Sequence, residues 1–113
     1  MRSDAERLND ILDAAEAAVR FARPRNRLQT EDDVLLAALT YQLIIIGEAS
    51  RAISAETRAA FPTLPWHQMV GMRNRVVHAY WSVDHENVWA TVDVDLPGLI
   101  VQLRGALRTT EMA

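Results

Sequence analysis

One short stretch of the sequence concentrates the side chains that can bind anions and move protons. Between residues 71 and 81 it carries an arginine (Arg73), an asparagine (Asn74) and, four positions after the asparagine, a histidine (His78). Residues four apart lie on the same face of a regular α-helix. We therefore expect Asn74 and His78 to share a polar ledge that Arg73 flanks, with Tyr80 just beyond its C-terminal end.

These residue types suit the cleavage of a phosphodiester. A histidine that titrates near neutral pH can move a proton, and an arginine can hold a phosphate and neutralise charge in the transition state. In RNA the 2′-hydroxyl is an internal nucleophile. A histidine that takes its proton and an arginine that stabilises the phosphorane would then act without a metal. Arg75 is a candidate contact to the RNA backbone, with an ordinary solvated position as its alternative.

The Arg-x4-His spacing is a weak signal by itself. An arginine and a histidine near a helix end commonly cap carbonyl groups or line a surface groove, and on spacing alone this structural role is preferred for Arg73 and His78. Tyr80 has a similar alternative as a half-buried aromatic whose hydroxyl lies at the surface. The spacing therefore needs support from the rest of the chain.

Composition and charge exclude several functional classes. The 113 residues suffice for one domain, residues 1–113, and not two. Twelve basic residues, all arginine, against fifteen acidic ones give a net charge of −3, which excludes a strongly basic protein that coats nucleic acid. The absence of cysteine excludes thiolate zinc sites, the histidines lack the spacing of a helical metal pair, and the N-terminus resembles no signal peptide. We expect no metal, no cofactor, no membrane association and a cytoplasmic location.

Helical periodicity dominates the chain and predicts an all-α, up-and-down bundle of four to five helices. The first helix is expected over residues 4–22, with Ser3 and Glu6 as its capping box. The second is expected to begin at Thr30, as N-cap, and to run to about Ile53. Further helices are expected over about residues 54–60, 66–79 and 84–91, and from about residue 95, where Pro97 either kinks one long helix or separates two.

The second helix is apolar on nearly every face. A helix of this kind must be covered on most sides. One small domain has few other residues with which to bury it, which favours a partner subunit. Within it, Tyr41 is expected in the core. Trp66 and Trp89 are expected to pack, whereas His67 and His85 are expected at the surface.

With these elements in place, the sequence resembles the HEPN superfamily, and within it the HepT-like ribonuclease toxins of bacterial and archaeal toxin–antitoxin pairs. Beyond Arg73-x4-His78, it shares Asn74 after the arginine and the extended motif that ends at Tyr80. Other shared segments stand in the family's order over nearly the whole chain: Ile46-Gly47-Glu48-Ala49, Leu64-Pro65-Trp66, Gly71-Met72-Arg73-Asn74 and Asp95-Leu96-Pro97.

The resemblance implies a HEPN-like helical bundle that forms a homodimer, with the Arg73 and His78 side chains of both subunits facing one another across a cleft. The implied activity is metal-independent endoribonuclease, with Arg73 and His78 catalytic and Asn74 orienting. The implied partner is an MntA-like nucleotidyltransferase antitoxin, which in such type VII pairs transfers AMP from ATP to the motif tyrosine, here Tyr80. The added charge and bulk would keep RNA out of the cleft.

Two other functions fit parts of the pattern. HEPN-like domains also serve as non-catalytic modules that bind nucleotides or RNA, or that assist a nucleotidyltransferase. A purely structural dimerisation bundle is the third alternative, and it predicts that Arg73 and His78 can be replaced with no effect beyond stability. Loss of cleavage and toxicity in His78→Ala would distinguish the nuclease from both.

Overall fold

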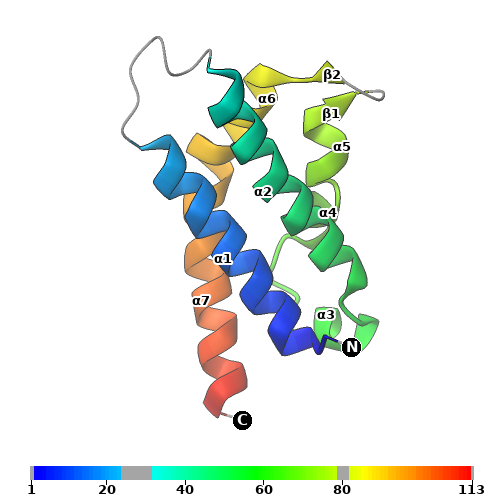
Figure 1. Cartoon of the computed structure of the whole chain (residues 1–113). Helices are drawn as coiled ribbons and strands as arrows, with labels where there is room; N and C mark the ends of the chain where they lie inside the picture. Colours follow the sequence, from blue (N-terminus) through cyan, green and yellow to red (C-terminus); the bar gives the residue numbers. More distant parts are fainter. Residues whose placement is uncertain (1, 24–31, 79–81, 113) are drawn as a thin grey trace.

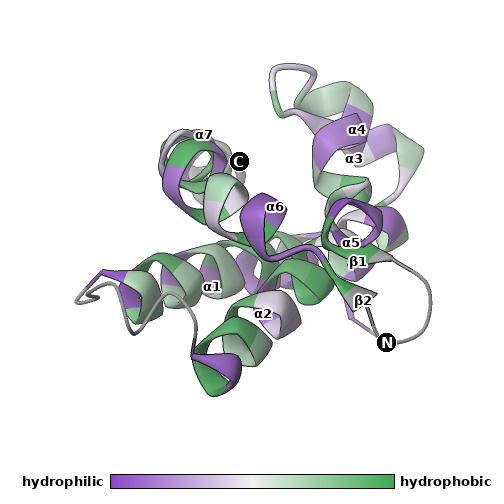
Figure 2. Cartoon of the chain, turned by 90° about the horizontal axis from the view of Figure 1, so that it is seen from above, coloured by the Kyte–Doolittle hydropathy of each residue, from purple (hydrophilic) through white to green (hydrophobic). Residues whose placement is uncertain are grey.

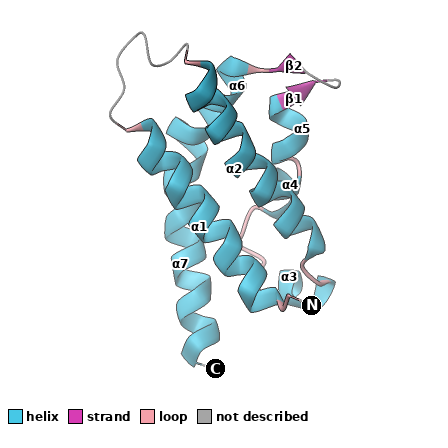
Figure 3. Cartoon of the chain, viewed as in Figure 1, coloured by secondary structure: helices cyan, strands magenta, loops and turns pink. Residues whose placement is uncertain are grey.

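The protein, here a computed structural model, is a bundle of helices with one short β-hairpin at its edge (Figures 1 and 3). The structure describes residues 2–23, 32–78 and 82–112. Its elements are α1 (Asp4–Ala22), α2 (Asp33–Ala52), α3 (Ala55–Ala60), α4 (Trp66–Val70), α5 (Met72–Val76), β1 (Val77–His78), β2 (Ser82–Val83), α6 (His85–Ala90), the π-helical η2 (Thr91–Asp95) and α7 (Leu96–Met112). The all-α bundle class is confirmed, although its helices are more finely divided than expected.

The first helix has the predicted bounds and cap. The amide of Glu6 donates to Ser3 Oγ at 3.1 Å, and the amide of Ser3 donates to Glu6 Oε1 at 3.0 Å, which completes the capping box. The buried face of α1 consists mostly of small side chains, which lets α1 pack closely along α2 and α7. Its members are Leu8, Ile11, Ala14, Ala15, Ala18 and Ala22.

A carboxylate at the start of α1 ties this helix to the corner between α2 and α3. Asp4 accepts hydrogen bonds from the hydroxyls of Ser54 and Thr57, each at 2.6 Å, and from the amide of Ser54 at 3.3 Å. These bonds favour the ionised form, so the Ser54 hydroxyl above all holds the pKa of Asp4 below its ordinary value. Ser54 also caps α3, where its Oγ accepts from the amide of Thr57 at 3.2 Å.

The second helix begins later than expected and turns part of its apolar surface outward. Its N-cap is Asp32, whose Oδ1 accepts from the amide of Val34 at 2.8 Å, so the predicted cap at Thr30, which lies outside the described residues, is wrong. Tyr41 was expected in the core, but 62% of it is exposed. Tyr41 is two residues from both Leu39 and Leu43, which are fully buried. A step of two turns a side chain by about 200°, to the opposite side of the helix.

By length and composition alone, α2 would suffice to cross a membrane. In the bundle it packs against α1 on one side and against α4, α5 and α6 on others. Seen from above, it carries hydrophobic residues on most of its turns (Figure 2). Only 39% of this apolar stretch is buried inside the bundle, so the other described helices cover α2 in part.

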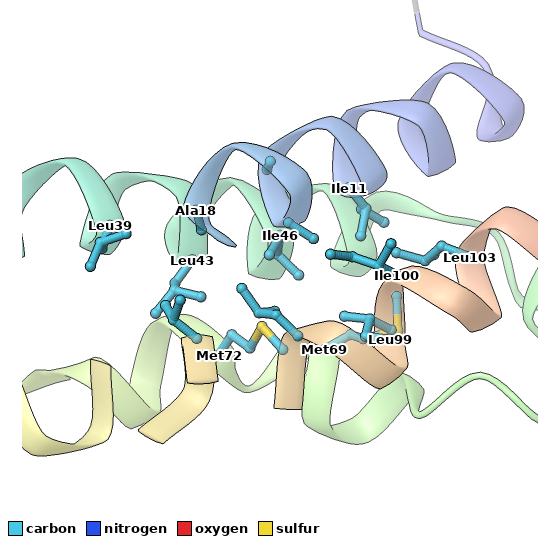
Figure 4. Packing of buried hydrophobic residues seen from close by; sticks show 14 of the residues in the cluster. Ile11, Ala18, Leu39, Leu43, Ile46, Met69, Met72, Leu99, Ile100 and Leu103 are labelled. Atoms are coloured by element: carbon cyan, nitrogen blue, oxygen red, sulfur yellow. The ribbon is translucent and has the colours of Figure 1, made fainter. Parts of the chain in front are cut away.

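The core lies where α1, α2 and α7 meet α4 and α5. Side chains from all five helices point toward one another in Figure 4: Ile11, Ala18, Leu39, Leu43, Ile46, Met69, Met72, Leu99, Ile100 and Leu103. Trp66 packs at the edge of this core and donates its indole N–H to the carbonyl of Phe61 at 2.9 Å, and Trp89 packs against the core as well. The predicted packing roles of both tryptophans are confirmed.

The helix expected over residues 66–79 is interrupted once and ends three residues early. It pauses at Gly71 between α4 and α5, and it ends at Val76. From Val77 the chain is extended and pairs with β2, where Val77 lies opposite Val83 and His78 opposite Ser82. Consecutive β-branched valines favour the extended form, and the amide of Asp84 donates to the carbonyl of Val76 at 2.8 Å, next to the Val77–Val83 pair.

The last helices form one continuous helical run from α6 through η2 to α7. In η2 the hydrogen-bonding step widens, and the amide of Leu96 donates to the carbonyl of Thr91, five residues back. Pro97 follows directly. A proline has no N–H, and its ring crowds the carbonyl four residues back, which the wider turn accommodates. Pro97 therefore does not separate two helices.

Candidate active site

Arg73 and Asn74 lie side by side on α5, both exposed to solvent. The Arg73 Nη1 group donates to Asn74 Oδ1 at 3.4 Å. On its other side, Arg73 Nε lies 3.9 Å from Glu48 Oε1 of α2, in a pair whose side chains are each about half exposed (50% and 56%). Exposed pairs of this kind add little to stability. The contact therefore orients Arg73 more than it holds the fold together.

A glycine on α2 allows α5 to approach this closely. A Cβ atom added at Gly47 would lie 3.3 Å from the Arg73 backbone nitrogen and 3.4 Å from the Val70 carbonyl oxygen. Contacts that short leave little room for any side chain, so glycine suits the position. Gly47 stands within one of the shared family segments, and its closeness to Arg73 gives that segment a physical role.

A cleft of about 380 Å³ opens between α2 and the α4–α5 segment. Besides Arg73 and Asn74, its polar lining consists of Glu48, Arg51 and His67. His67 is exposed, as predicted, but no functional role was expected for it or for Arg51, and Glu48 was expected only as part of a shared family segment. Two signals were available: the shared segment Ile46-Gly47-Glu48-Ala49, and the spacing of Gly47 and Arg51, which places them on the same face of α2.

His78 lies in a strand and not in the helix that was expected to hold it. Because the helix ends at Val76, the expected shared helical face of Asn74 and His78 is wrong: His78 lies in β1, directly after the helix that carries Arg73. Its side chain, and the whole of Tyr80, lie outside the described residues. That His78 and Tyr80 act together with Arg73 stays a prediction.

Arg75 is not brought into the cleft. It is two residues from Arg73, and so turned about 200° around the helix, and its Nη1 pairs with Asp95 Oδ2 at 3.0 Å. The Arg75 carbonyl accepts from Asn87 Nδ2 at 3.1 Å, and the same Nδ2 donates to Asp84 Oδ2 at 2.9 Å. These contacts fasten the end of α5 to α6.

The charges in the cleft suit a small anion. Arg51 and Arg73 bring two positive charges and Glu48 brings one negative charge, while the His67 imidazole offers a hydrogen-bond donor. Guanidinium groups bind phosphate through paired N–H donors. Among residues 2–23, 32–78 and 82–112, no group of three or more histidine or acidic side chains is placed to hold a metal ion.

Comparison with known proteins identifies the group to which these features belong. The family model described as "Ribonuclease HepT-like" matches residues 11–105. A protein of Methanocaldococcus jannaschii named "Putative RNase MJ1380" is 36% identical over 80% of this chain and 84% of its own length. "Probable ribonuclease HepT" of Thermococcus cleftensis is 35% identical over 87% of this chain and 90% of its own. No solved structure matches the chain.

Proposed function

Since the chain belongs to the HepT-like ribonuclease family, we propose that it is a metal-independent endoribonuclease and the toxin of a toxin–antitoxin pair. The observation that carries this proposal is the exposed Arg73–Asn74 pair at a cleft whose lining holds two arginines and one glutamate. His78 follows on the adjoining strand, at the spacing that the family motif requires.

The reaction assigns one task to each side chain. His78 accepts the proton of the 2′-hydroxyl, and the 2′-oxygen attacks the adjacent phosphorus. Arg73 binds the phosphate and stabilises the charge that builds up in the phosphorane, while Asn74 orients Arg73. The bond from phosphorus to the 5′-oxygen then breaks, leaving a 2′,3′-cyclic phosphate. A second histidine, His78 of the partner subunit, protonates the departing 5′-oxygen.

A homodimer completes this site in the proposal. Support comes from the outer side of α2, where Val34 is 79% exposed and Tyr41 is 62% exposed. Large apolar side chains exposed together mark interaction surfaces. The N-terminal half of α2, which carries both residues, rises toward the end of the bundle that holds α6 and the β-hairpin (Figure 1). A second subunit on this side would lie near His78.

The proposed regulator is an MntA-like nucleotidyltransferase, acting in the cytoplasm. The hydroxyl of Tyr80 attacks the α-phosphorus of ATP, pyrophosphate leaves, and Tyr80 carries AMP. What supports this step is the motif spacing, Arg73-x4-His78-x-Tyr80. A bulky anion so close in sequence to Arg73 and His78 would compete with RNA for the same cations.

The experiment incubates the purified protein with RNA in the presence of EDTA and compares it with Arg73→Ala and His78→Ala. We expect cleavage to end in cyclic phosphate and both variants to lose at least about 10²-fold in rate, with the dimer intact. Nucleotide or RNA binding without cleavage by the wild type would overturn the nuclease in favour of a binding module. Unmodified Tyr80 after co-expression with an active antitoxin would refute the regulatory step.

A further inference from the structure

The cleft extends well past Arg73 and has two helical walls. Gly47, Glu48 and Arg51 of α2 form one wall, and the other runs from His67 on α4 to Asn74 on α5. Along α2, Arg51 lies one turn beyond Gly47, about 6 Å along the axis. Arg73 therefore stands at one end of the cleft and Arg51 toward the other.

Arg51 is a cation without a partner among the residues that the structure describes. Five of the nine other described arginines form ion pairs: Arg2 with Asp10, Arg7 with Asp4, Arg73 with Glu48, Arg75 with Asp95 and Arg104 with Glu16. Arg58 Nη2 donates to the carbonyls of Ser50 and Arg51, leaving the Arg51 side chain itself exposed. Arg51 lies in the last turn of α2, where a positive charge interacts favourably with the helix dipole. The alternative to a binding role is therefore that Arg51 only stabilises the end of this helix.

His67 lines the same cleft as Arg51, from the opposite helical wall. It is exposed at the start of α4, and it lines the cleft together with Asn74 of α5. Gly71 stands between them and has no side chain to close the cleft. A guanidinium and an imidazole on the two walls of one cleft both offer N–H donors to an anion bound between them.

We propose that Arg51 and His67 form a second phosphate-binding subsite, which holds the phosphate next to the one that is cleaved. This inference rests on the proposed ribonuclease function, because Arg73 then holds the scissile phosphate. In a chain of net charge −3, a short row of two arginines and a histidine confines RNA to this cleft. Glu48 Oε1 lies 3.9 Å from Arg73 Nε, so its negative charge opposes the binding of any anion at that end of the cleft.

The test compares Arg51→Gln and His67→Gln with Arg108→Gln, which removes an exposed charge from α7. Cleavage is measured on a dinucleotide, with one phosphate, and on a longer oligoribonucleotide. For Arg51→Gln we expect the preference in kcat/KM for the longer RNA to fall about tenfold, the size of a charge-assisted hydrogen bond. The loss should be in KM. His67→Gln should act in the same direction, and Arg108→Gln should not.

Salt dependence gives a second readout that a purely structural role would not move. Losing one phosphate contact should reduce the slope of log affinity against log salt by about 0.7 for a single strand. We expect this for Arg51→Gln, with Arg51→Lys in between, each checked for folding by circular dichroism. If the wild type and Arg51→Gln showed the same preference for the longer RNA and the same salt slope, the proposed subsite would be wrong. If the wild type bound RNA but never cleaved it, the proposed nuclease activity would be wrong, and the salt slopes alone would test the subsite.

Discussion

Gly47 on α2 and Arg73 on α5 approach so closely that a Cβ atom at Gly47 would lie 3.3 Å from the Arg73 backbone nitrogen. Gly47→Ala should therefore move α5 by a few tenths of an ångström. Its effect on the free energy of unfolding should stay within about 1 kcal/mol, because alanine gains about that much in helix propensity. Cleavage should fall more than stability does.

The matched control for this substitution is Gly98→Ala on α7, where a Cβ atom meets nothing within 4 Å. It should raise stability by up to about 1 kcal/mol and leave cleavage as it is. Urea unfolding and initial cleavage rates measure both quantities. If Gly47→Ala behaved like Gly98→Ala in both, the close approach would have no role in placing Arg73.

Asn87 should matter more for stability than its half-buried position suggests. Its Nδ2 donates to the Arg75 carbonyl and to Asp84 Oδ2. Asn87→Ala removes both bonds, so we expect a loss of about 1–2 kcal/mol in the free energy of unfolding. The control is Asn9→Ala on α1, whose side chain bonds only its own helix, to the carbonyl of Ala5. Similar losses in the two variants would contradict the idea that Asn87 holds α5 to α6.

The hydrogen bonds of Asp4 predict that part of the folding stability is lost in acid. Because the pKa of Asp4 is lowered in the folded state, chiefly by the Ser54 hydroxyl, the protein is stabilised above the ordinary aspartate pKa of about 3.9. That contribution is lost as pH falls through the lowered pKa. Melting temperatures from pH 7 to 2 should show a smaller acid-induced drop for Asp4→Asn than for the wild type. Asp13→Asn, an exposed change on the same helix, should follow the wild type.

The exposed apolar side of α2 predicts where two subunits meet. Tyr41→Glu should shift the protein from dimer to monomer in sedimentation at micromolar concentration and should reduce cleavage in parallel, because the proposed site needs both subunits. Val101→Glu on α7 is the comparison, since Val101 is 67% exposed and lies on another face. A wild type that sediments as a monomer, or dissociation by Val101→Glu alone, would count against this interface.

Local signals predicted most of the helices well. The capping box at Ser3 and the caps at Ser54 and Asp84 were predictable, because a hydroxyl or carboxylate just before a helix accepts a hydrogen bond from a free amide of its first turn. Tyr41 was misplaced because the near-uniform apolarity of α2 hides which side faces the core. The helix end at Val76 was missed because it depends on pairing with a strand that follows only after a turn.

The candidate site was predictable in part. Arg73 and Asn74 are neighbours in sequence, so their adjacency was expected from the motif. The roles of Gly47, Glu48 and Arg51 depend on how α2 packs against α5, which no local pattern reports. Their cleft therefore became visible only in the folded chain.

The π-helical segment η2 has a consequence for how the chain length can vary. A π-helical turn holds one residue more than the α-helical turn it replaces. We expect deletion of one residue within η2 to restore an ordinary α-helix while α7 keeps its rotational phase. Deletion of one residue in α7 before Leu103 would instead rotate the helix beyond it by about 100° and draw Leu103 out of the core. η2 is thus the place in this long helical run where natural relatives can differ in length by one residue and still bury the same side chains.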